Sequence, residues 1–158
     1  MVAANITAYG IGLFIHILAV VVALGPGFSY GIIFSVVPNH PRSAPVVIEA
    51  MQRVDRYIVT PGLIVILAAG IYLMSKGSWD ASEGFITIGF IAIIALFGLQ
   101  HGFFNPQMRK ARELAERDLK GGEALSEEFQ EIGRRLGTVG PVTGLIVVVT
   151  IFFMVVKP

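Results

Sequence analysis

Two histidines lie inside apolar stretches of this 158-residue chain, and they are the side chains there best suited to chemistry. His16 lies in the first apolar stretch, and His101 lies near the end of the third. An ionisable side chain inside a membrane helix is costly to keep, so it is a candidate functional residue by default. Neither histidine has an acidic or basic neighbour within its own stretch, so any charged partner must come from another segment.

Helical spacing places His16 on a stripe of small residues, with Gly12 at i−4, Ala19 at i+3 and Ala23 at i+7. We expect this stripe to face the interior of a helix bundle, where a flat apolar cofactor could lie against it. Neutral imidazole is the usual axial ligand of b-type haem, so one hypothesis is haem bound by His16 beside Gly12, Ala19 and Ala23. The alternative is a packed histidine hydrogen-bonded to a neighbouring backbone carbonyl or hydroxyl.

His101 lies beside Gln100 and one turn before Asn105. Counted along the expected helices, His16 and His101 differ in depth by on the order of 25 Å, at about 1.5 Å per residue. We therefore reject one iron held by both, and treat the two histidines as metal ligands of separate sites. For His101 the alternative is hydrogen bonding at the membrane interface.

Composition excludes several classes of protein. The chain has no cysteine, which removes disulfides, iron–sulfur clusters, thiolate zinc sites and covalently attached c-type haem. Its net charge of +1 does not indicate a nucleic-acid partner. The sequence also has no P-loop, dinucleotide fingerprint or recognisable Ser/His/Asp set. Only 15% of its residues are charged and 54% are hydrophobic, which favours a membrane protein.

Four apolar stretches are long enough to cross the hydrocarbon core of a bilayer, which takes about 20 residues. They run at about 8–37, 57–75, 84–104 and 139–156. We predict an all-α membrane protein, a four-transmembrane-helix bundle that forms a single membrane domain over residues 1–158. Close packing is expected at glycines spaced four apart. These pairs are Gly27/Gly31, Gly98/Gly102 and Gly140/Gly144.

Charge predicts the orientation of the bundle. The 38–56 and 105–138 segments hold all the basic residues except Lys76 and Lys157. The positive-inside rule therefore places both charged loops in the cytoplasm and both termini outside the plasma membrane.

The charged segment 107–136 is itself predicted to be helical, because its apolar residues recur at helical spacing in two stripes. The stripes are Met108, Ala111, Ala115, Leu119 and then Leu125, Phe129, Ile132, Leu136. We expect either two short amphipathic cytoplasmic helices at the inner membrane surface or an extension of the third span. This surface is either solvated or docks a partner.

The residues just before the second span carry further alternatives. Segment 43–56 is expected to be helical and to lie in the membrane interface. Its apolar face is Val46, Val47, Ala50, Met51 and Val54. Arg53, Asp55 and Arg56 bind lipid headgroups or a propionate-bearing cofactor, or act only as topology determinants. No Asp or Glu falls inside the four predicted spans, which argues against a proton-coupled transporter built on a carboxylate.

The first span resembles that of an uncharacterised bacterial family of predicted four-span integral membrane proteins, in the strings FIHILAVV (14–21) and LGPGFSY (24–30). Asp55-Arg56-Tyr57, Pro61-Gly62 and Gly70-Ile71-Tyr72 are similar to that family as well, and the resemblance covers essentially the whole chain. More distantly, the first span resembles the membrane-bound, haem-associated protoporphyrinogen oxidase and the copper-resistance D-type membrane domains. The resemblance to the oxidase implies that His16 is a candidate haem ligand.

The leading hypothesis is therefore a membrane protein of redox or haem-related chemistry that binds b-type haem through His16, or works beside a membrane redox complex. The alternative is a non-enzymatic accessory or assembly subunit of a larger membrane complex. A weaker alternative is metal handling or small-molecule permeation. Besides the lipid bilayer, the candidate partners are a redox complex or a second copy of the chain.

Overall fold

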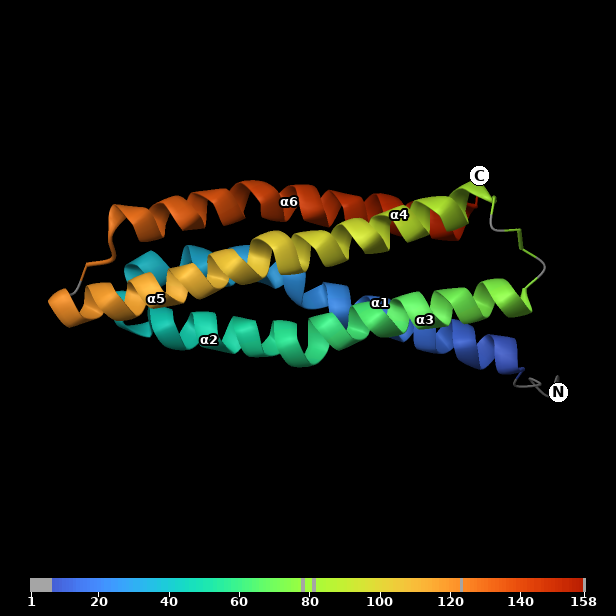
Figure 1. Cartoon of the computed structure of the whole chain (residues 1–158), viewed down its shortest axis with the longest axis horizontal. Helices are drawn as coiled ribbons and strands as arrows, with labels where there is room; N and C mark the ends of the chain where they lie inside the picture. Colours follow the sequence, from blue (N-terminus) through green and yellow to red (C-terminus); the bar gives the residue numbers. More distant parts are fainter. Residues whose placement is uncertain (1–6, 78, 81, 123, 158) are drawn as a thin grey trace.

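The computed structural model describes residues 7–77, 79–80, 82–122 and 124–157, so residues 1–6 and 158 of the predicted domain lie outside the described residues. The described chain is helical and contains no strand, which confirms the predicted all-α class. The helices are α1 (Ala8–Ser35), α2 (Ala44–Val54), α3 (Thr60–Lys76), α4 (Gly84–Leu99), α5 (Asn105–Gly121) and α6 (Glu127–Val156). Figure 1 shows an elongated bundle with both ends of the chain at one extremity.

Four continuous helical stretches in the described residues are long and apolar enough to cross a membrane, as predicted. They are Ala8–Asn39, Pro41–Lys76, Gly84–Gly121 and Glu127–Val156. The second and third contain 36 and 38 residues, or about 54 and 57 Å of helix, against a hydrocarbon core of about 30 Å. Their excess length lies at the end of the bundle formed by residues 37–54 and 105–136, which we call the charged end.

Two π-helical turns make these long stretches continuous. Asp55–Val59 joins α2 to α3, and Gln100–Phe104 joins α4 to α5. The third span is therefore extended by α5, which was one of the two alternatives expected. Residues 127–136 do not form a separate surface helix either, because they are the first turns of α6, whose N-cap Ser126 accepts a hydrogen bond from the Phe129 N–H.

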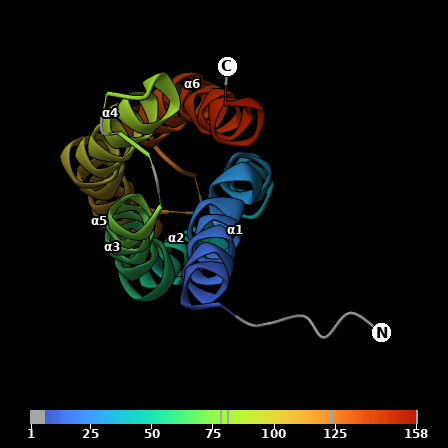
Figure 2. The same cartoon turned by 90° about the vertical axis from the view of Figure 1, so that its right-hand side faces the viewer.

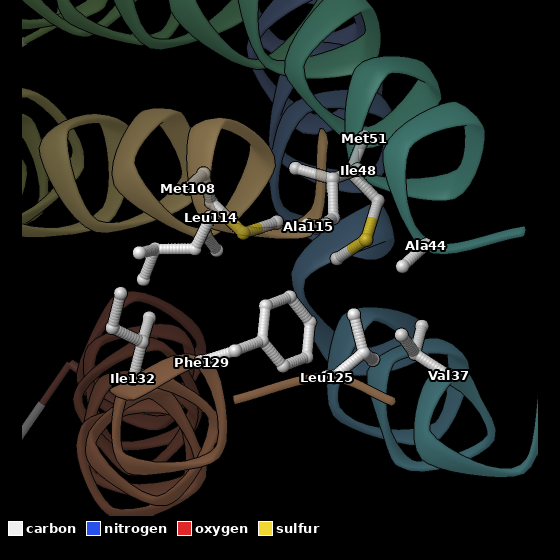
Figure 3. Close-up of a cluster of buried hydrophobic side chains, with 11 residues drawn as sticks. Val37, Ala44, Ile48, Met51, Met108, Leu114, Ala115, Leu125, Phe129 and Ile132 are labelled. Atoms are coloured by element: carbon white, nitrogen blue, oxygen red, sulfur yellow. The ribbon is translucent and has the colours of Figure 1, made fainter. Parts of the chain in front are cut away.

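The apolar stripes of the charged end pack on one another and on α2 instead of facing solvent or a partner. Their buried residues join Val37, Ala44, Ile48 and Met51 in one cluster, in which the Phe129 ring lies among side chains from α2, α5 and α6 (Figure 3). Phe34 of α1 stacks on Phe129 with ring centroids 5.6 Å apart. The apolar surface that these stripes would offer to a partner is therefore buried within the chain itself.

The buried face of α2 differs from the one expected. α2 buries Ala44, Ile48 and Met51, whereas the side chain of Val46 is 71% exposed. The reason is that α2 does not lie flat as an interfacial helix but runs on into α3 along the bundle (Figure 1), with its inner face set by α5.

A second cluster fills the membrane half of the bundle. It consists of Ala19, Ala23, Val59, Leu63, Ile66, Ile93, Leu96 and Val147. Figure 2, viewed along the bundle, shows α1 beside α3 and α4 beside α6. α1 and α3 approach closely at Gly62 of α3, which lies against Ala23 of α1. Of the glycine pairs predicted to pack, only Gly144 has a neighbour within 4 Å of a built Cβ, the ring of Phe28.

Candidate functional site

His16 lies on the face of α1 that packs against α3. Its Nδ1 is 3.1 Å from the backbone oxygen of Ile66. A carbonyl oxygen only accepts, so Nδ1 carries the proton and donates, and Nε2 is left as the acceptor nitrogen of the neutral ring. Gly70, one turn further along α3, lies beside the ring, and a Cβ there would make an ordinary contact with His16 Cε1 at 3.5 Å. This geometry agrees with the alternative of a packed, hydrogen-bonded histidine.

The stripe around His16 faces the interior, as expected, but α3 already covers it. A Cβ added to Gly12 would lie 2.7 Å from the Tyr72 ring. A Cβ added to Gly62 of α3 would lie even closer to the Cβ of Ala23. Gly12, Ala19 and Ala23 are all buried. A porphyrin does not fit between this stripe and α3. Haem binding at His16 stays a prediction, and it would have to use Nε2 away from the stripe.

His101 lies in the π turn that joins α4 to α5 and is exposed. The side-chain amide of Asn105 donates to its Nδ1 over 3.2 Å, and its ring lies 4.7 Å from the ring of Phe97. This arrangement agrees with interfacial hydrogen bonding. His101 interacts electrostatically with Asp55. His16 lies at the level of Ile66, which is eleven residues, or about 16 Å, from Asp55 along the same helix. The two histidines therefore do not meet.

Asp55 was considered from the sequence only together with Arg53 and Arg56, and its burial was not predicted. It is 3% exposed, and it is the one buried charged side chain among the described residues. The hydroxyl of Tyr30 on α1 donates to its Oδ1 over 2.9 Å, and the Met51 carbonyl lies 3.3 Å from the same hydroxyl. Gln100 supplies a further side-chain hydrogen bond from the other π turn. None of the four predicted spans contains a carboxylate, and Asp55 lies two residues before the second of them, in the π turn that joins α2 to α3.

Helical register explains why Asp55 is buried. It lies four residues after Met51 and four before Val59, both buried, so it continues the inner face of the α2–α3 helix. The π turns at Asp55–Val59 and Gln100–Phe104 face each other across this point, since Gln100 forms a hydrogen bond with Asp55 and His101 interacts with it electrostatically. Single π-helical turns are rare and occur often at functional sites.

A cavity of about 410 Å³ borders this polar cluster. Its lining comes from both π turns and the start of α5 and includes Asp55, Arg56, His101, Asn105 and Arg109. Asp55 is 21 residues, or about 32 Å of helix, from Lys76 at the far end of α3. That length equals about one hydrocarbon thickness, which predicts a position for the cavity at the membrane boundary of the charged end.

Within the residues that the structure describes, no three His, Cys, Asp or Glu side chains come together in a way that could hold a metal ion. His16 and His101 accordingly have separate surroundings, as expected, and neither belongs to a cluster of that kind.

Comparison with known proteins places the chain in a family. Searches of curated proteins and of solved structures returned no match. Residues 11–158 match the model of the family described as predicted integral membrane protein (DUF2269). The chain therefore belongs to this family, which confirms the resemblance to an uncharacterised membrane family. None of the comparisons supports the more distant resemblance to the oxidase or the copper-resistance domains.

Proposed function

We propose that this DUF2269 protein transfers protons at the membrane boundary, and that Asp55 is the group that takes up and releases the proton. The supporting observation is a carboxyl group that is 3% exposed, held by Tyr30 and bordered by a cavity at one end of a membrane bundle. Buried acidic side chains in membrane helices commonly belong to proton relays.

The surroundings of Asp55 hold its carboxyl group in place. Tyr30 donates to Oδ1 and fixes the orientation of the carboxyl group. His101 is exposed and borders the same cavity, so it passes protons between water and the carboxyl group. Gln100 donates to the carboxylate and to Asn105 rather than exchanging protons itself, because an amide does not titrate.

Infrared difference spectroscopy of the protein in lipid nanodiscs, recorded between two pH values, tests this proposal. We expect a pH-dependent C=O band of a carboxylic acid that disappears in Asp55→Asn and moves in frequency in Tyr30→Phe. Glu113→Gln is the matched control, because Glu113 is an exposed carboxylate of α5. The control keeps the band. A band that survives in Asp55→Asn, or a wild-type protein without the band, would show that Asp55 exchanges no proton.

The second candidate is a redox function in which His16 binds b-type haem. One point supports it, the Nδ1–H···O=C bond to Ile66, since haem and metal-binding histidines commonly donate their other N–H to a carbonyl. The test is the absorption spectrum of protein purified after expression with ample haem. A Soret band that is lost in His16→Ala and kept in His101→Ala supports the proposal. The absence of a Soret band, or a Soret band that is unchanged in His16→Ala, rejects haem binding by His16.

The third candidate is the non-enzymatic accessory subunit. It is supported by the low burial of two membrane-crossing helices within the chain. Only 11% of the apolar segment of the first helical stretch and 6% of that of α6 are buried. Native mass spectrometry of protein extracted in mild detergent tests it. A stoichiometric second polypeptide is expected, and a species that is always alone or bound only to copies of itself rejects this function.

A further inference from the structure

Two arginines at the charged end face one cavity without a charge partner. Arg56 follows Asp55 in the first π turn, and Arg109 lies on the first turns of α5, so their side chains reach the 410 Å³ cavity from different helices. Neither forms an ion pair with any acid in the described part of the chain. Arg56 lies over the neighbouring Tyr57 ring, with its guanidinium carbon 5.8 Å from the centroid, and it also borders the adjacent hollow beside Glu49.

The neighbouring arginines show that this is not a general property of the charged end. Arg53 and Arg112 line an adjacent hollow of about 510 Å³, and both pair with Glu49. Arg112 also pairs with Glu116 at 2.8 Å. The carboxylate of Glu49 is thus engaged by Arg53 and Arg112, whereas no ion pair among the described residues neutralises Arg56 or Arg109.

The level of the cavity fits a lipid headgroup. Arg56 is 20 residues, or about 30 Å of helix, from Lys76, which puts it where the phosphates of the charged-end leaflet lie. Tyr57 is 69% exposed beside it, as is usual for aromatic residues at the membrane interface. Gln52, Thr60 and Asn105 add neutral hydrogen-bonding groups to the lining.

We propose that this cavity binds the phosphate of an anionic phospholipid, clamped between the guanidinium groups of Arg56 and Arg109. Guanidinium groups bind phosphate through two parallel hydrogen bonds, and basic pockets between membrane helices are known to hold anionic headgroups. Asp55 repels the phosphate only weakly, because it is 3% exposed and its Oδ1 accepts a hydrogen bond from Tyr30. This site goes beyond the proposed proton transfer and does not depend on it.

Native mass spectrometry of the protein released from nanodiscs of equimolar phosphatidylglycerol and phosphatidylcholine tests the proposal. We expect phosphatidylglycerol to be retained preferentially, and Arg56→Gln/Arg109→Gln to reduce that preference at least tenfold. The matched control is Lys120→Gln/Arg134→Gln, which removes the same charge at the same end but away from the cavity. The control keeps the wild-type preference. Arg56→Lys/Arg109→Lys gives an intermediate value, because lysine keeps the charge and loses the paired hydrogen bonds.

Three results would overturn the inference. One is equal retention of the two lipids by the wild-type protein. Another is an equal loss in both double variants, which would mean that the whole basic surface attracts anionic lipid without a site. The last is that inorganic phosphate at micromolar concentration displaces the lipid, which would assign the clamp to a soluble phosphate. All variants keep Asp55 and Tyr30, so failure here leaves the infrared result on Asp55 unaffected.

Discussion

Replacing Gly62 by alanine tests how tightly α1 and α3 are joined. The new Cβ would lie less than 3.0 Å from Ala23 Cβ, a separation that real Cβ atoms essentially never show, whereas ordinary contact begins at 3.4 Å. The Cβ of Ala23 is a methyl group fixed to the backbone that cannot rotate away, so the two helices must move apart. Overpacking of this kind costs about 1–3 kcal/mol.

Gly31→Ala is the matched control, because Gly31 also lies in a membrane-crossing helix and nothing lies within 4 Å of its built Cβ. Both substitutions restrict the unfolded chain equally, so the two variants differ by the packing cost alone. The measurement is unfolding by SDS in mixed micelles, followed by the fluorescence of Trp79, the single tryptophan. Gly62→Ala should be the less stable variant by about 1–3 kcal/mol.

The double variant Ala23→Gly/Gly62→Ala completes the experiment. With the methyl group of Ala23 removed, the nearest atom is the Cα at position 23, at 3.3 Å, so a shift of a few tenths of an ångström relieves the contact. We expect most of the lost stability to return. If Gly62→Ala is as stable as Gly31→Ala, or if Ala23→Gly rescues nothing, the close approach of α1 and α3 is not what joins them.

Three further predictions concern the charged end and the orientation. Hydrogen bonds from Ser126 hold the pKa of Asp118 below its usual value of 3.8, so its contribution to stability is present above that pH and is lost as the pH falls through the lowered pKa. Asp118→Asn should flatten the acid limb of the unfolding profile, and an unchanged limb would refute this. Because Phe129 is 1% exposed, Phe129→Ala should lower the free energy of unfolding by about 3–5 kcal/mol in the same SDS assay. A loss below about 1 kcal/mol would contradict its place in the cluster. Because the chain has no cysteine, Lys120→Cys should be protected from a membrane-impermeant thiol reagent in intact cells and Lys157→Cys should react, and the reverse pattern would invert the predicted orientation.

The spans could be predicted from the sequence because length and apolar composition alone decide whether a helix can cross a bilayer. The continuity of the second and third spans with α2 and α5 could not. Asn105-Pro106 and the charged residues near 53–56 suggest boundaries, but a π turn before each proline keeps the helix intact. Such turns depend on tertiary contacts that a helical pattern does not contain.

The candidate site, like the fold, could be predicted only in part from the sequence. His16 was identified because a histidine in an apolar stretch is conspicuous, and its hydrogen bond to a backbone carbonyl was one of the two alternatives considered. The burial of Asp55 was not predicted, because its arginine neighbours are typical of an exposed charged segment. A signal was present, since Asp55 continues the buried positions Ile48 and Met51 at helical spacing. Its contact with Tyr30, 25 residues earlier, follows only from the packing of α1.

The two buried clusters are held together by different forces, because they lie in different solvents. The cluster around Phe129 lies beyond the predicted spans, where water drives its burial, while the cluster around Leu63 lies in the bilayer, where lipid competes equally well for apolar surface. Urea acts on burial from water, so it should open the first cluster while the spans stay inserted. The protein would then unfold in two steps, and its helices could spread within the membrane without leaving it.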